Sequence, residues 1–123
     1  MTQTVKWLPR PEKHDFHAAE DYLSLIMAPR RAIEWRKKLA AARNDITHRK
    51  AKDILRASQL ALLGEEDKHV AADLRKAASG AALSPILLLR GGQEHPLIVA
   101  DGYHRICASY WIDENTDIPC VLV

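Results

Sequence analysis

In the first third of the chain, apolar residues recur every three or four positions, which is the spacing of one helix face. From Phe16 onward this face is formed by Ala19, Tyr22, Leu23 and Ile26. Pro29 ends the segment, and proline is tolerated in the first turn of a following helix. The pattern therefore predicts a hairpin of two helices, the first from Phe16 toward Pro29 and the second over about residues 30–43, with a loop at 44–49.

Shorter apolar runs alternate with helix-like patterns over the rest of the chain. An acidic run at residues 65–67 opens one helical pattern and Gly80 closes it, as the helix dipole and a C-terminal cap favour. Another helix is predicted over residues 103–112, directly after the turn residue Gly102. The predicted strands are residues 51–55, 86–90, 97–100 and 118–123.

The chain has 123 residues, of which 47% are hydrophobic. This length and composition predict one globular domain, residues 1–123. No apolar run approaches the ~18 residues that a membrane span needs. Residues 1–11 do not resemble a signal peptide either. We therefore expect a cytoplasmic protein with no membrane partner.

The two cysteines, Cys107 and Cys120, lie in separate apolar segments. Neither has the CxxC or Cys/His spacing of a zinc site. A free thiol in an apolar segment packs as a small hydrophobic side chain. The sequence thus predicts two buried, reduced thiols and no metal site.

Charge is distributed unevenly along the chain. Residues 30–56 hold ten Lys/Arg and three acids, a net charge of +7, whereas the whole chain carries only +2. A basic segment of this kind fits an acidic partner such as DNA, with Arg36, Lys37 and Arg43 contacting backbone phosphates. It fits a solvated helix face equally well, and both interpretations stay open.

Candidate chemistry is concentrated where the strand 97–100 gives way to the next helix. Gly102 permits a tight turn there, and the first amides of the helix lack intrahelical acceptors and bind anions well. Arg105 adds a guanidinium and His104 a titratable donor, while Asp101 can accept a proton or a sugar hydroxyl or bind a metal. Taken alone, the same residues also describe a simple capped helix with Arg105 in solvent.

Residues from about 52 to 123 resemble the ParB/sulfiredoxin superfamily along their whole length. The 101–105 box, Asp-Gly-Tyr-His-Arg, is similar to the Gly-x-His-Arg signature of sulfiredoxins and to the Asp-Gly-x-His-Arg of many ParB-like relatives. The other matching segments, in order, are Asp53-Ile54-Leu55 as an opening strand, the helix beginning near Asp67, the strand entry at residues 83–88 and the ending at residues 118–123.

The resemblance implies an α+β fold with a small mixed sheet and flanking helices, formed by residues 49–123. The helical hairpin, residues 1–48, precedes this core and has no counterpart in the family. The resemblance also implies a pocket for ATP, ADP or CTP, accompanied by Mg²⁺. The residues expected to bind the nucleotide phosphates are Gly102, Tyr103, His104 and Arg105, with Lys68 or His69 from the helix near 67.

Two departures from the family narrow the expected chemistry. Tyr103 stands where sulfiredoxins have a nucleophilic cysteine, and a phenol cannot replace a low-pKa thiolate. Sulfinic-acid reduction is therefore not expected. The DNA-reading domain and dimerising tail of chromosome-segregation ParB proteins also have no counterpart in the sequence, so we do not expect a clamp at a specific DNA site.

Three functional classes remain open. The first is a nucleotide-binding protein, as a phosphotransferase or nucleoside triphosphatase in which Asp101 is catalytic and a second carboxylate comes from residues 65–67. The second is a DNA-associated ParB-like module, for binding or nuclease activity, that uses the basic segment 30–56. The third is a non-catalytic interaction protein. A homodimer is compatible with each of them, through the last strand or the helical hairpin.

Overall fold

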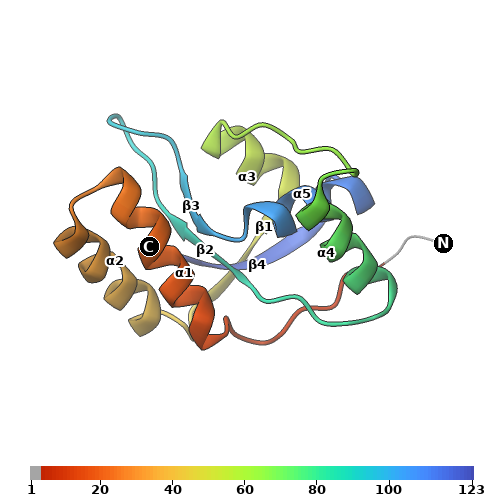
Figure 1. Cartoon of the computed structure of the whole chain (residues 1–123), viewed down its shortest axis with the longest axis horizontal. Helices are drawn as coiled ribbons and strands as arrows, with labels where there is room; N and C mark the ends of the chain where they lie inside the picture. Colours follow the sequence, from red (N-terminus) through yellow and green to blue (C-terminus); the bar gives the residue numbers. More distant parts are fainter. Residues whose placement is uncertain (1–3) are drawn as a thin grey trace.

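The computed structural model describes residues 4–123 and contains five helices and four strands in that range. The helices are α1 (Lys13–Ile26), α2 (Pro29–Ala41), α3 (Ala51–Ser58), α4 (Lys68–Ala78) and α5 (Tyr103–Ile112). The strands are β1 (Ile46–Lys50), β2 (Ile86–Leu89), β3 (Ile98–Asp101) and β4 (Asp117–Leu122). The α+β class predicted from the sequence is confirmed (Figure 1).

The strands form one mixed sheet in the order β1-β4-β2-β3. β4 is parallel to β2, and the two outer pairs, β1 with β4 and β2 with β3, are antiparallel. β2, one of the two inner strands, is buried over its whole length. Its continuous apolar run is typical of a strand covered on both faces.

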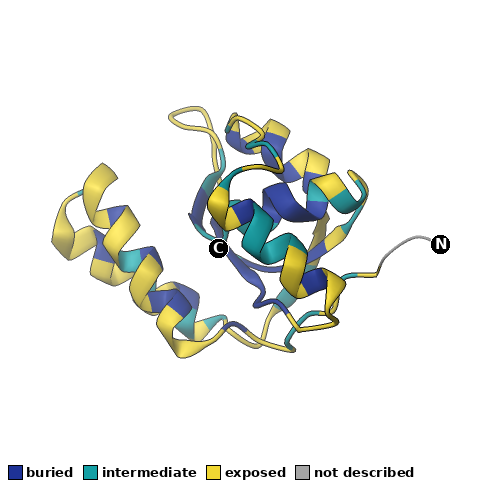
Figure 2. Cartoon of the chain, turned by 45° about the vertical axis from the view of Figure 1, so that its right-hand side comes forward, coloured by how far each residue is buried: buried dark blue, intermediate teal, exposed yellow. Residues whose placement is uncertain are grey.

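Helices cover both faces of this sheet. Ile86 and Leu88 of β2 pack in a cluster with residues of α3, α4 and α5. Leu87 and Leu89, on the opposite face, pack in a second cluster with residues of α1 and α2. Figure 2 shows the same division, with buried residues on the strands and exposed ones on the outer side of the hairpin. The α1–α2 hairpin is therefore one layer of the fold, and its expected boundary at residue 48 falls inside β1.

Two sequence predictions between residues 44 and 58 are wrong. The expected loop at 44–49 contains strand β1, and the expected strand at 51–55 is the start of helix α3. β1 lies at the sheet edge, where exposed His48, Arg49 and Lys50 hide the strand pattern and also discourage pairing with other chains. The apolar residues of α3 follow a helical spacing instead, with Ala51, Ile54, Leu55 and Ser58 buried.

Other predictions agree closely with the structure. α5 covers the predicted residues 103–112, and α4 ends before Gly80, whose φ of +82° suits the residue after a helix. Cys107 and Cys120 are buried free thiols, as expected. Among residues 4–123, no helix is both long enough and apolar enough to cross a bilayer.

Candidate functional site

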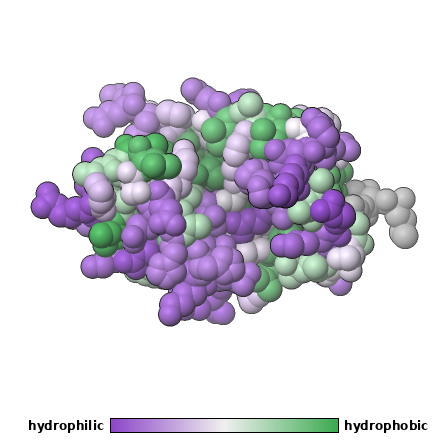
Figure 3. All heavy atoms as spheres, in the orientation of Figure 1, coloured by the Kyte–Doolittle hydropathy of each residue, from purple (hydrophilic) through white to green (hydrophobic). Residues whose placement is uncertain are grey.

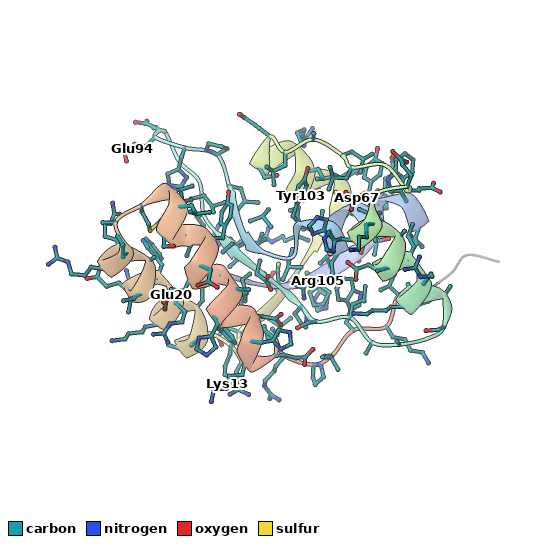
Figure 4. All side chains as sticks on the ribbon, in the orientation of Figure 1. Lys13, Glu20, Asp67, Glu94, Tyr103 and Arg105 are labelled. Carbon is teal, nitrogen blue, oxygen red and sulfur yellow. The ribbon has the colours of Figure 1, made fainter. Side chains whose placement is uncertain are left out.

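The 101–105 box forms one wall of a cavity between the first turn of α1, the helix α4 and the start of α5. The cavity has a volume of about 390 Å³. In Figure 4, Arg105 lies near the middle of the molecule, between α1 and α4. The ionisable residues that line the cavity are Glu12, His14, Asp15, His69, Asp73, Lys76, Asp101, Tyr103, His104 and Arg105.

The guanidinium of Arg105 is hydrogen-bonded to other groups of the protein. Its Nη1 donates to the Ser84 carbonyl and its Nη2 to Asp101 Oδ2, each at 2.6 Å. The side chain is only 13% exposed. The guanidinium expected to hold a phosphate is therefore mainly an anchor between α5, β3 and the segment before β2.

Asp15 is a site residue that the sequence reasoning missed. It lies in the first turn of α1 and is 4% exposed. Its Oδ2 accepts the Glu12 amide at 2.8 Å and the Ser84 hydroxyl, and its Oδ1 lies 3.9 Å from Arg105 Nη2. The one local signal is the Glu12-x-x-Asp15 spacing of a helix start, and it carries no information about a partner 90 residues away.

The environment of Asp101 favours the protonated, neutral form of its carboxyl group. Burial raises the pKa of this carboxyl from 3.8 to about 6, with the neighbouring Asp15 carboxylate acting in the same direction. The Arg105 guanidinium acts against burial, because it favours the carboxylate. A carboxyl with a pKa near 6 exchanges its proton close to neutral pH, which suits a proton acceptor.

This shift predicts a specific pH dependence of stability. A carboxyl whose pKa is raised on folding stabilises the protein below its ordinary pKa, and that contribution is lost as the pH rises through the folded value. The difference between 3.8 and about 6 corresponds to roughly 3 kcal/mol. We expect the free energy of unfolding of the wild type, minus that of Asp101→Asn, to fall by about 2–3 kcal/mol between pH 4 and pH 7.

Urea unfolding at each pH measures this difference. Asp53→Asn is the matched control, because it removes an exposed carboxylate that also pairs with an arginine, at 3.6 Å. A difference curve for Asp101→Asn that stays flat or rises with pH contradicts the assigned environment of Asp101.

The imidazoles of the predicted site come together. The His69 and His104 ring centroids are 4.7 Å apart, and both side chains line the cavity. The exposed Lys68 does not line it. Of the two basic residues expected from the helix near 67, the structure thus places His69 at the cavity.

Tyr103 and Asp67 have structural partners. The Tyr103 hydroxyl donates to the Ala61 carbonyl and so ties the 59–67 segment to α5. Asp67 Oδ1 caps α4 by accepting the amides of His69 and Val70, and the Val70 amide is the main cause of its lowered pKa. The expected run 65–67 does not line the cavity, and the carboxylates that line it beside Asp101 are Glu12, Asp15 and Asp73.

Packing against the core requires a glycine at position 102. Its φ is +111°, and an added Cβ would lie 2.8 Å from Ile86 Cβ and closer still to Ile86 Cγ2. The first backbone bond of α5 runs from the Ile106 amide to the Gly102 carbonyl, at 3.0 Å. The amides of residues 103–105 precede it and lack intrahelical acceptors, so the turn presents donors to the cavity.

The lining also decides which charges a ligand meets. Four carboxylates stand against two permanent cations, Lys76 and Arg105, with three histidines at the same walls. No group of three or more His, Cys, Asp or Glu residues in the range 4–123 has the geometry of a metal site. The cavity carboxylates could supply the one or two ligands that Mg²⁺ takes beside substrate phosphates, so the expected Mg²⁺ stays a prediction that depends on a bound nucleotide.

No family model, curated protein or solved structure matches this chain. The resemblance of residues 52–123 to the ParB/sulfiredoxin superfamily stays a prediction that depends on the ordered set of matching segments, and one of these, the expected opening strand at 53–55, is helical in the structure. The nucleic-acid candidates Arg36, Lys37 and Arg43 lie outside the cavity, on α2 and just after it.

Proposed function

We propose that this chain binds a nucleotide by its phosphates in the cavity at the start of α5. The observation that carries the proposal is the open start of a ten-residue helix facing a cavity of about 390 Å³. Unpaired amides and the positive end of the helix dipole favour an anion at this position. His104 of α5 lines the same cavity, and His69 and Lys76 add donors from the second helix, α4.

The cavity has the size of a small-molecule site, since such pockets range from about 300 to 1,000 Å³. ATP, ADP and CTP are the candidate ligands, because the resemblance of the 101–105 box points to this class. The polar lining suits the phosphate end of the nucleotide. The base would then extend past the cavity mouth, where selectivity among the three would arise.

The carboxylates set a condition on binding. Asp15 and Asp101 line the same cavity and would repel a free polyanion there, although Arg105 offsets part of this repulsion. Mg²⁺ commonly reaches protein sites coordinated by substrate phosphates and only one or two carboxylates. We therefore expect the Mg²⁺ form of the nucleotide to bind more tightly than the free form.

Thermal stability tests this proposal. A ligand at a hundredfold excess over its Kd stabilises the folded state by about 2.7 kcal/mol, which raises Tm by about 10 °C in a domain of this size. We expect such a rise with at least one of Mg²⁺-ATP, Mg²⁺-ADP and Mg²⁺-CTP. His104→Ala should abolish most of the rise, whereas His48→Ala, which removes an exposed imidazole from β1, should preserve it.

Absence of any Tm change with all three nucleotides, with and without Mg²⁺, at millimolar concentration would rule out the proposed function. An equal loss of the response in both histidine variants would place the ligand elsewhere. Nucleotide consumption by the wild type, and its loss in Asp101→Asn with binding retained, would add catalysis by Asp101 to the binding function.

A further inference from the structure

A second depression lies on the other side of α1. It has a volume of about 460 Å³ and lies between the first turns of α1 and the second half of α2. Its lining residues are Pro11, Lys13, Phe16, His17, Arg36, Ala40 and Arg43. This basic groove has no carboxylate in its lining, in contrast with the cavity at α5.

The first turns of α1 lie between the two depressions. Asp15 lines the α5 cavity, whereas Lys13, Phe16 and His17 line the basic groove. In Figure 4, Lys13 lies at the lower end of α1 and Glu20 lies further along the helix. An anion in the groove would therefore lie across the width of α1 from Asp15 and would not contact the carboxylates of the α5 cavity.

The cations of the groove are held in different ways. Arg36 Nε donates to Glu20 Oε1 at 2.7 Å, and both side chains are about one-third exposed or less. This pair fixes one end of the groove. Within residues 4–123, neither Lys13 nor Arg43 forms an ion pair. Both are exposed, so their charges are available to a ligand.

Positive charge continues beyond the groove. Arg30, Arg31, Lys37 and Lys38 are exposed on the rest of α2, where Glu34 is the one exposed carboxylate, and Arg49 and Lys50 are exposed on β1. At a rise of about 1.5 Å per residue, the 13 residues of α2 alone span about 20 Å. In Figure 3 the lower edge of the molecule, where α1 begins, is formed by hydrophilic residues. A single phosphate occupies only one end of such a surface.

We propose that the basic groove and the outer side of α2 bind the phosphate backbone of nucleic acid. The length of the surface favours a polymer with regularly spaced charges over a free phosphate. Phe16, the aromatic side chain of the groove, is only 7% exposed and offers no platform for a base. Binding is therefore independent of base sequence, and it does not depend on the proposed nucleotide site.

Fluorescence anisotropy with labelled 20-mer DNA, single-stranded and duplex, tests the inference across 50–200 mM NaCl. For duplex DNA, the three Lys/Arg side chains of the groove alone give a slope of log K against log salt of about −2.7, which is about a 40-fold loss of affinity over this range, and contacts from the outer side of α2 steepen it. Removing two contacts with Lys13→Gln/Arg43→Gln should make the slope shallower by about 1.8. The same charges are removed from α4 in the control Lys68→Gln/Arg75→Gln, which should bind like the wild type.

Several outcomes overturn the inference. They are undetectable binding at 50 mM NaCl, a salt slope unchanged in the Lys13/Arg43 variant, and equal losses in the two double variants. Displacement of DNA by inorganic phosphate at low millimolar concentration would assign the groove to a free phosphate. Equal affinity for a polyglutamate peptide would assign it to acidic polypeptides. All four exchanged residues are exposed, so unchanged melting temperatures verify the folding of both variants.

Discussion

Arg105→Ala is expected to lower the free energy of unfolding by about 3–5 kcal/mol at pH 8, the cost of removing one partner from a buried ion pair. The substitution leaves Asp101 without its 2.6 Å partner and Asp15 without a permanent cation, since its other basic neighbour is the imidazole of His14 at 3.5 Å. It also leaves the Ser84 carbonyl without its guanidinium donor. Two carboxylates would then share a largely buried corner with no counter-charge.

Arg56→Ala is the matched control for this experiment. Arg56 also pairs with an aspartate on its own stretch of chain, Asp53, but its side chain is 87% exposed. Exposed pairs contribute about 0–1 kcal/mol, so this variant should unfold almost like the wild type. Urea unfolding of both variants at pH 8 measures the contrast. Equal losses would show that Arg105 does not hold the corner together.

Acid should restore part of the stability lost in Arg105→Ala. The guanidinium is the main group that lowers the pKa of Asp101, so its removal favours the protonated carboxyl further. A neutral Asp101 no longer needs a cation beside it. The gap between variant and wild type is therefore expected to narrow from pH 8 to pH 5. A gap that widens over this range would contradict the assignment of the loss to unpaired carboxylates.

The internal role of Arg105 also affects how the nucleotide site is tested. An alanine at this position would abolish ligand binding through loss of the fold as readily as through loss of a phosphate contact. His104 separates the two effects better, because it lines the cavity and has neither of the internal bonds that hold Arg105. His104 variants are therefore suited to testing ligand binding, and Arg105 variants to testing stability.

The parts of the site predicted from sequence are those built from consecutive residues. The strand end, the turn at Gly102 and the helix 103–112 follow one another in the chain, and local preferences determine each of them. β1 and α3 were misassigned because the polar strand β1 owes its conformation to pairing with β4, which lies 67 or more residues away. Tertiary pairing overrides weak local preference in such segments.

The contribution of α1 to the site could not be predicted locally. Asp15 reaches the cavity because Phe16, Ala19 and Leu23 bind the helix to the sheet face formed by Leu87 and Leu89. The sequence shows the apolar stripe of α1, and it does not show which surface covers that stripe. Asp15 therefore looks like an ordinary acidic residue at a helix start, and its burial depends on the assembled layers.

Gly102→Ala is expected to destabilise the protein by about 3 kcal/mol or more, because two separate penalties combine. A residue with a side chain at φ +111° is strained by about 1–3 kcal/mol. The new Cβ also collides with the buried Ile86, and forcing extra atoms into a packed core costs about 1–3 kcal/mol. Gly92→Ala is the control, since a Cβ there meets nothing within 4 Å. Urea unfolding of the two variants provides the measurement.

A double-mutant cycle with Ile86→Ala separates the two penalties. Ile86→Ala alone costs about 2–5 kcal/mol through the cavity it leaves, but it also removes the Cγ2 that meets the new Cβ. The double variant should therefore be more stable than the sum of the single losses by about 1 kcal/mol or more. Strict additivity of the two losses would show that the contact with Ile86 does not contribute to the cost of Gly102→Ala. The glycine of the 101–105 box would then be required by its backbone angle and by the approach of a ligand, and core packing would have no part in it.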